Sequence, residues 1–474
     1  MASPGGPEHF KGNRTMSLTK VLLVVYAFPP AGGVGVLRAA SLARYLPAEG
    51  IRFDVLTTRN PAAVGSDPSL LRDIPAEVTI HRTITLDLPF GIKKWIKRKI
   101  TGVKAHSRKG DGTGKPGKPN FLKKVLQDFL LPDPQVMWLP ILTRAARRIV
   151  KDREIDVVVI TGAPFSAFLL IERLRKEFPH LPIVADFRDE WLISQFEFGS
   201  FQFSSSERAR SFAVSAEARA VANATAVVTV NEAALTVMRD RYSQEPADKF
   251  HLISNGFDAT RVRRCAPTAN PRPDGKILVA HIGTLYTATD PTALIEALQS
   301  LPPEVKSRIK LHFIGHIDEL RIREALLKLG DMVELIGYMP QGDALAAMDE
   351  AEYVLMVGHD RLNIQGKFYD YIGSGKPILA CLHPGGDIRR LLDELRAGWW
   401  AGNQDVQGIR QLFIDAVERG DRLHTEFQPD LEKIAQFERK ALAKQYATLL
   451  HEIAGKGQEW DPPAASVVRA GVGA

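Results

Sequence analysis

Hydrophobic positions along the chain repeat one pattern. An apolar run of strand length at 20–28 is followed by a Pro/Gly loop at 29–35, a stretch with apolar residues at helical spacing, and a second apolar run at 52–58. Continuous apolar strands alternating with helices are typical of a parallel sheet that is covered on both faces. The pattern returns at 154–162, 181–187 and 226–230.

The pattern stops at 264–276, a stretch with three prolines and no periodicity, and then resumes. Further strands are predicted at 277–284, 310–316, 332–338, 353–359 and 376–382. We therefore predict an α/β protein with two doubly wound Rossmann-like domains, in which ligands bind beyond the carboxyl ends of the strands. The predicted parts are a disordered tail (1–18), an N-terminal domain (19–263), a linker (264–276), a C-terminal domain (277–430), a last helix (431–455) and a second tail (456–474).

Composition narrows the class of protein. Of the 474 residues, 45% are hydrophobic and 25% are charged, which excludes a disordered, collagen-like or polytopic membrane chain. The two cysteines, Cys265 and Cys381, lie far apart, so a disulfide framework is excluded and a structural zinc site is disfavoured. We expect a reducing, cytoplasmic setting.

The net charge of +7 comes from one segment, 91–124. Outside that segment, 50 basic residues face 54 acidic ones. As a helix, 91–100 would place Ile92, Trp95, Ile96 and Ile100 on one stripe beside five cations, which is the pattern of an interfacial helix on an anionic membrane. We expect a peripheral position at the inner membrane face. A solvated basic loop and a nucleic-acid site are the alternatives, and the near-neutral remainder disfavours nucleic acid.

The chain contains seven sequence blocks in the following order: YAFPPAGGVGVLRAASLARYL, TGAPFSAF, VADFRDEW, ISNGFD, HIGTLYTATDPTALIEAL, GYMPQGDALAAM and IQGKFYDYIGSGKPILA. Together these blocks resemble glycosyltransferase family 4. The resemblance is to the branch with a "PGKLFEYLASGKPIL"-like block and covers about residues 20–450. It implies a GT-B fold, a UDP- or GDP-sugar donor held mainly by the C-terminal domain, and a last helix that crosses back to the first domain. It also implies sugar transfer to a hydroxyl of a lipid-linked or polysaccharide acceptor, with retention of configuration.

The resemblance assigns a donor site in the second domain. Asp370 falls where the family has a glutamate for the ribose, and a carboxylate can accept hydrogen bonds from two adjacent hydroxyls. The family's usual arginine and lysine for the diphosphate fall on Thr284 and Thr289, so Lys367, after Gly366 at a helix start, becomes the best candidate. The alternative is that Lys367 and Asp370 form a solvated i,i+3 pair.

Further donor contacts are expected from both domains. Gly33 and Gly35 lie in a loop whose backbone can approach an anion, and Arg38 follows one turn into the helix, unless the glycines serve only a tight turn. The remaining candidates are Gly283 and Thr284, after the first strand of the second domain, and Tyr338, in the segment that lines the base.

The acceptor side is expected in the VADFRDEW block. Asp186 and Asp189 could accept the proton of the acceptor hydroxyl and Arg188 suits a phosphate or carboxylate, unless an Asp–Arg pair only braces this loop. The chain has no Asp-x-Asp pair, so we expect no metal and no cofactor beyond the nucleotide sugar. A sugar-nucleotide epimerase and a catalytically reduced partner subunit remain alternatives; the Thr284 and Thr289 replacements favour the latter.

Overall fold

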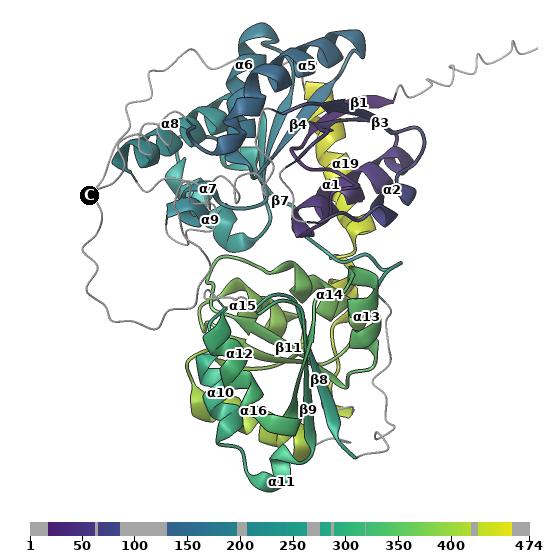
Figure 1. Cartoon of the computed structure of the whole chain (residues 1–474). Coiled ribbons are helices and arrows are strands. Elements are labelled where there is room, and N and C mark those ends of the chain that lie inside the picture. Colours follow the sequence, from purple (N-terminus) through teal and green to yellow (C-terminus); the bar gives the residue numbers. More distant parts are fainter. Residues whose placement is uncertain are drawn as a thin grey trace, which may run out of the picture.

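The computed structural model describes residues 18–61, 65–85, 130–196, 206–262, 275–285, 289–317, 319–418 and 425–456. The basic segment 91–124, most of the predicted linker and nearly all of both predicted tails lie outside these ranges. Two parallel sheets lie one above the other, each with helices packed on it (Figure 1). This confirms the predicted α/β class with two Rossmann-like, doubly wound domains.

The first sheet has seven parallel strands in the order β3-β2-β1-β4-β5-β6-β7. Their bounds are β1 (Thr19–Val24), β2 (Ile51–Thr58), β3 (Thr79–Thr83), β4 (Val157–Gly162), β5 (Ile183–Phe187), β6 (Ala226–Thr229) and β7 (Phe250–Leu252). The helices of this domain are α1 (Val34–Tyr45), α2 (Ser69–Arg72), α5 (Leu139–Asp152), α6 (Leu169–Glu177), α7 (Trp191–Phe196), α8 (Glu207–Asn223) and α9 (Glu232–Arg241).

The second sheet has six parallel strands in the order β10-β9-β8-β11-β12-β13. Their bounds are β8 (Ile277–Ile282), β9 (Ile309–Ile314), β10 (Val333–Gly337), β11 (Tyr353–Gly358), β12 (Ile378–Leu382) and β13 (Gly398–Gly402). The helices that follow Leu252 are α10 (Thr292–Gln299), α11 (Pro303–Lys306), α12 (Leu320–Leu327), α13 (Gln341–Asp349), α14 (Gly366–Ser374), α15 (Asp387–Glu394), α16 (Val406–Glu418), α18 (Leu431–Ala435) and α19 (Arg439–Lys456).

Strand β1 shows how the two faces of the first sheet are filled. Successive side chains of a strand point to opposite faces. Leu22 and Val24 therefore join the core beneath α5 and α6, whereas Val21 and Leu23 join a second core beneath α1 and α19. Because both faces are buried, the strand reads as a continuous apolar run and shows no alternation with polar residues.

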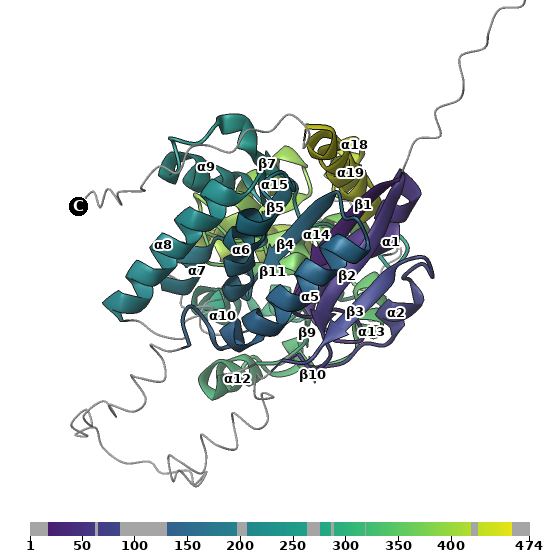
Figure 2. The same cartoon turned by 90° about the horizontal axis from the view of Figure 1, so that it is seen from above.

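The predicted last helix is divided in the structure. Residues 436–438 leave the helical conformation because the Phe437 carbonyl accepts a hydrogen bond from the Phe257 amide (3.1 Å), while the Arg439 amide donates to the Phe257 carbonyl (2.9 Å). Helix α18 therefore ends at Ala435 and α19 begins at Arg439. Helix α19 then runs beside α1 in the first domain, as the two views show (Figure 1, Figure 2). There Tyr446 and Leu450 are fully buried.

The sequence did not predict three strands, β3, β7 and β13. Each of them is a short edge strand of its sheet with partly exposed side chains. Because their side chains are only partly buried, these strands lack the continuous apolar run by which the central strands were recognised. No described helix is long and apolar enough to cross a bilayer.

Candidate functional site

The carboxyl ends of both sheets border a cleft of about 1830 Å³ between the two domains. Residues that follow β1 and β5 contribute to one wall, and residues that follow β8, β10 and β11 contribute to the other. Every predicted site residue lines this cleft except Asp186. The cleft therefore brings together predicted site residues that lie as far apart in the sequence as positions 33 and 370.

Lys367 lies in the second-domain wall, in the first turn of α14. Its Nζ is 3.1 Å from Nε2 of His281, and the side chain lies against the backbone of Gly283. No described carboxylate forms an ion pair with it, so burial lowers the pKa of this ammonium to about 7. The alternative interpretation, a solvated surface pair with Asp370, is not what the structure shows, since no ion pair joins Lys367 and Asp370. A desolvated cation at a helix start instead favours binding of an anion.

Two backbone features shape the wall around Lys367. Gly283 has φ +115°, a conformation that favours glycine, and its carbonyl lies so close to Gly315 that a Cβ on Gly315 would overlap it. At the start of α14, the N-cap residue Gln365 makes no side-chain capping bond. The first amides of α14 thus lack a side-chain partner at the cap, as a helix start needs in order to receive a phosphate.

Asp370 faces the cleft one turn after Lys367 and makes no hydrogen bond with another described residue. Burial raises the pKa of its carboxyl to about 6, and the Arg439 cation partly opposes that rise. Arg439 belongs to α19, lines the cleft and donates through Nε to the Gly256 carbonyl (3.0 Å). Sequence reasoning missed Arg439, since the resemblance predicts the crossing helix but singles out no residue on it.

Tyr338 and His316 form a stacked pair in the second-domain wall. Their ring centroids lie 5.2 Å apart with an interplanar angle of 8°, and Tyr338 is 70% exposed. By contrast, His281 is fully buried, with Nδ1 3.0 Å from the Leu355 carbonyl. Of these two histidines, only His316 lines the cleft. The exposed face of Tyr338 is suited to stacking against a planar ring.

Arg188 braces the first-domain wall through backbone carbonyls. Its guanidinium donates to Gly162 (3.0 Å), to Ala163 (2.5 Å) and to Gly35 in the glycine loop. No described carboxylate lies within ion-pair distance, so burial lowers the pKa of Arg188. Arg188 therefore fixes the glycine loop beside the end of β4 and brings an unpaired positive charge to the cleft.

The structure corrects the catalytic expectation for Asp186. Its side chain is fully buried, and its two carboxyl oxygens accept from Nε (3.1 Å) and Nη2 (2.9 Å) of Arg38. Arg38 also donates to the Ser254 carbonyl (2.8 Å). Asp186 therefore has no contact with the cleft and holds Arg38 in place, while Arg38 itself reaches the cleft wall.

Asp189 is the acidic residue of the VADFRDEW block that does reach the cleft. Burial raises the pKa of its carboxyl, Arg188 opposes the rise, and Asp360 across the cleft adds to it. No described residue forms a hydrogen bond with this carboxylate. A carboxylate with a raised pKa and free oxygens can accept a proton from a hydroxyl.

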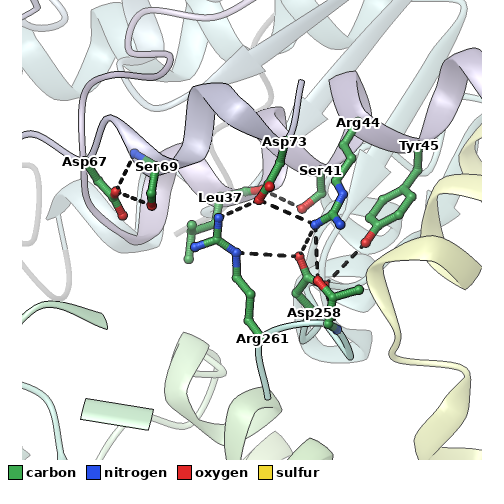
Figure 3. Close-up of polar contacts among 10 residues, drawn as sticks. Leu37, Ser41, Arg44, Tyr45, Asp67, Ser69, Asp73, Asp258 and Arg261 are labelled. Atoms are coloured by element: carbon green, nitrogen blue, oxygen red, sulfur yellow. Dashed lines mark hydrogen bonds and ion pairs between the residues drawn. The ribbon is translucent and has the colours of Figure 1, made fainter. Parts of the chain in front are cut away.

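A polar network closes the cleft where α1, α2 and the end of the first domain meet (Figure 3). Asp258 accepts from Arg44 (2.8 Å) and Tyr45 (3.3 Å), and Asp73 accepts from Arg261 (2.5 Å). Sequence reasoning missed this network, because its members are separated by almost 220 residues. It contains two carboxylates and two guanidinium groups, so it is internally compensated and acts as a structural tie.

Among the described residues, no group of three or more His, Cys, Asp or Glu side chains could hold a metal ion. Thr284 lines the cleft, whereas Thr289 is buried and does not. The cations that face the cleft are therefore Lys367, Arg188, Arg38, Arg261 and Arg439, and they come from both domains.

Comparison with known sequences places this cleft in context. Residues 31–261 match the family model described as Glycosyltransferase Family 4. The chain is 27% identical over 222 residues to the putative colanic acid biosynthesis glycosyltransferase WcaL of Salmonella typhimurium; the match covers 44% of this chain and 52% of the relative. The chain is also 27% identical over 163 residues to the probable glycosyltransferase WbjE of Pseudomonas aeruginosa, a match that covers 33% of this chain and 40% of the relative. The matches thus span about half the length of these curated relatives.

Solved structures with the same architecture span nearly the whole chain. Anabaena HepE, solved with UDP and glucose, superposes with a TM-score of 0.56 at 15% identity over 92% of this chain and 100% of that one. WaaG, described as a glycosyltransferase involved in lipopolysaccharide biosynthesis, has a TM-score of 0.53 and 15% sequence identity over 93% of this chain and 98% of WaaG. Sucrose-phosphate synthase from Thermosynechococcus elongatus has a TM-score of 0.60 and 15% identity over 92% of this chain and 99% of the synthase. The likeness shows the GT-B fold.

Proposed function

From the family-model match over residues 31–261 and the likeness to curated glycosyltransferases, we propose that this chain is a glycosyltransferase of family 4, which transfers a sugar from a nucleotide-diphosphate donor to a hydroxyl of a glycan or lipid-linked acceptor. One observation carries the proposal. Lys367 is a half-buried cation without a carboxylate partner among the described residues, and it lies at a helix start in an interdomain cleft. A diphosphate supplies the charge that this arrangement lacks.

The second domain offers each part of a nucleotide sugar a suitable group. Lys367 and the first amides of α14 would bind the diphosphate, and Asp370 would accept hydrogen bonds from the ribose hydroxyls. Tyr338 offers an exposed ring for the base. Support for a UDP-type donor comes from HepE, which was solved with UDP and with UDP-glucose.

The first domain would supply the acceptor side. In the transfer step, the acceptor oxygen bonds to the anomeric carbon while the bond from that carbon to the diphosphate oxygen breaks. The hydroxyl proton passes to Asp189, and the negative charge that develops on the leaving diphosphate is stabilised by Lys367 and Arg188. Retention of configuration and independence from metal ions are part of this proposal and follow from the family resemblance.

The proposed acceptor is a polysaccharide or lipopolysaccharide intermediate at the cytoplasmic face of a membrane. This rests on WcaL and WaaG, whose names place them in colanic acid and lipopolysaccharide biosynthesis, and on the Trp-bearing basic segment 91–100. Each lysine or arginine near an anionic surface contributes about 1 kcal/mol.

A thermal-shift panel of UDP, GDP and their sugar conjugates tests the donor site. At ligand concentrations of about 100 times Kd, binding stabilises the native state by about 2.7 kcal/mol, and we expect one nucleotide to raise Tm by several degrees. Lys367→Ala and Asp370→Ala should abolish the shift. Lys310→Ala, on β9 and outside the cleft lining, should retain it.

One observation favours a second candidate function. Thr284 and Thr289 stand where the family usually has its diphosphate cations, as in a catalytically reduced GT-B partner subunit. If no nucleotide in the panel changes Tm, the transferase proposal fails and this reading takes its place. An epimerase would instead convert the nucleotide sugar without any acceptor, which NMR of the donor would detect.

A further inference from the structure

Helix α9 contacts the second domain at its N-terminus. Its N-cap residue, Asn231, accepts from the Ala234 amide (2.7 Å) and donates through Nδ2 to the Leu362 carbonyl across the cleft (2.7 Å). The Ala233 amide donates to Oδ2 of Asp387, the first residue of α15 (3.0 Å). Figure 1 shows α9 at the lower edge of the first domain, above α15. The second domain thus holds the start of a first-domain helix.

The C-terminus of α9 contacts the loop that carries Asp189. Nη1 of Arg241 forms ion pairs with Oε1 of Glu190 and with Oε1 of Glu217 (2.6 Å). The other carboxyl oxygen of Glu190 accepts from the Ile193 amide (2.5 Å), so Glu190 caps α7 directly after Asp189. The position of Arg241 therefore determines the position of Glu190.

The charges around Arg241 hold it firmly. Glu190 and Glu217 are both buried, and one guanidinium serves both carboxylates. Burial raises the pKa of Glu217 to about 7, although Arg241 and a hydrogen bond from Tyr242 (2.7 Å) favour its ionised form. Moving Arg241 away would leave the two buried carboxylates without their cationic partner, which is strongly unfavourable.

The second-domain contact of α9 lies in the loop that leads into the donor wall. Oδ1 of Asp360 accepts from the amides of Leu362 (2.8 Å) and Asn363 (3.1 Å), which fixes the loop before Gly366 and Lys367. Asp360 and Asn363 both line the cleft. The ten residues of α9, about 15 Å along the axis, thus separate a contact with the donor loop from a contact with the Asp189 loop.

We propose that Arg241 is a positioning residue for Asp189, and that α9 couples the seating of the second domain to the placement of the Asp189 loop through Asn231 and Asp387 at one end and Arg241 and Glu190 at the other. The role of Asp189 rests on the proposed function, but the coupling does not.

Hydrogen exchange of the full-length protein measures the coupling without any ligand. Asp387→Ala removes the acceptor of the Ala233 amide, and we expect the amides of α7 to exchange about tenfold faster although they lie in the other domain. Arg390→Ala is the matched control on the same helix: among the described residues, Arg390 pairs with Asp387 and Glu394 and with no side chain of the first domain. It should leave α7 unchanged.

Arg241→Lys tests the other end of the helix. A lysine cannot bridge both glutamates as the guanidinium does, so α7 should again lose protection. In the double variant with Asp387→Ala, the loss of amide protection in α7 should be no larger than in Arg241→Lys alone, because both substitutions act through helix α9. Substitutions at distant, independent sites would instead have additive effects. Should Arg241→Lys fail to fold, Glu217→Gln replaces it: the Arg241–Glu190 contact remains, so α7 should keep its protection.

The outcomes separate this inference from the proposed function. Unchanged exchange in α7 for Asp387→Ala, strict additivity in the double variant, or loss of protection in Glu217→Gln would each overturn the coupling, even if a nucleotide raises Tm. Coupled exchange with no nucleotide response would refute the donor site alone. Once a donor is known, Arg241→Lys should lower kcat about tenfold with little change in donor KM, because donor contacts remain intact.

Discussion

At the residue scale, the cleft is defined by charges that lack partners. Lys367 and Arg188 carry half-buried positive charge without a described carboxylate partner, and Asp370 and Asp189 carry carboxyl groups without a described hydrogen bond. By contrast, the charges of Arg38 and Asp186 are paired with each other. This contrast marks where a ligand is needed, because an unpaired buried charge is otherwise costly.

The pKa shifts predict how donor binding depends on pH. Free Lys367 has a pKa of about 7, but it must be protonated beside a diphosphate, so above pH 7 binding takes up a proton and affinity falls by up to about tenfold per pH unit. Below about pH 6, protonation of Asp370 removes the ribose acceptor. Affinity should therefore be highest between these values.

Calorimetric titration at several pH values, with the nucleotide sugar that the thermal-shift panel identifies, measures this pH dependence of donor affinity. A nucleotide sugar is suitable because the phosphates of such a donor do not titrate near neutrality. Lys367→Met should weaken binding and flatten the alkaline limb. An alkaline limb that persists in Lys367→Met would show that another group is responsible.

The Arg38–Asp186 pair predicts a stability effect. Asp186→Ala leaves the Arg38 cation buried opposite an apolar space, so we expect the free energy of unfolding to fall by about 3–5 kcal/mol. Replacing both partners, as Arg38→Met with Asp186→Leu, should recover most of the loss. Urea unfolding measures both variants, and a small effect of Asp186→Ala would contradict the role assigned to this pair.

At the element scale, the division between α18 and α19 ties the last segment of the chain to the end of the first domain. The exchange of hydrogen bonds between Phe257 and residues 437 and 439 requires close contact at Gly256. A Cβ on Gly256 would overlap the Phe437 carbonyl oxygen and approach Leu442. The element boundary is therefore set by a tertiary contact.

Gly256→Ala should accordingly destabilise the protein by about 1–3 kcal/mol, since the backbone of 436–438 must shift. Gly455→Ala is the matched control: it lies in α19 with open space around it, and alanine is the better helix former by up to about 1 kcal/mol. Thermal unfolding compares the two. Equal Tm values would show that the crossing tolerates the methyl group.

At the scale of the whole molecule, the two sheets face each other with their carboxyl ends, and the cleft between them contains groups from both. The net charge of +7 belongs to the first domain's segment 91–124, whose structure lies outside the described residues. The same domain carries the proposed acceptor residues, so a membrane-bound segment would bring the acceptor side to the lipid surface.

Neutralising the five cations within 93–99 should abolish binding to phosphatidylserine vesicles, because each contributes about 1 kcal/mol. Nucleotide binding should be unaffected, since the donor wall lies in the other domain. Vesicle co-sedimentation at two salt concentrations measures the first effect and thermal shift the second. Persistent vesicle binding would refute a membrane role for this segment.

The sequence alone predicts the central strands, the helix that carries Lys367 and Asp370, and their place at a strand end. Buried parallel strands are continuous apolar runs, and Gly366 precedes the lysine at the helix start. Edge strands β3, β7 and β13 escape prediction because their side chains are partly exposed. The division of the last helix also escapes it, because Phe257 lies about 180 residues earlier.

The sequence by itself thus determined the two-domain α/β class, because local patterning suffices for that, and its family resemblance singled out candidate site residues of which all but Asp186 line the cleft. Only the tertiary structure decided the roles within the VADFRDEW block. It pairs Asp186 with Arg38, binds Arg188 to carbonyls and leaves Asp189 open to the cleft. Those roles depend on which distant groups face each side chain, and neighbours in sequence carry no information about that.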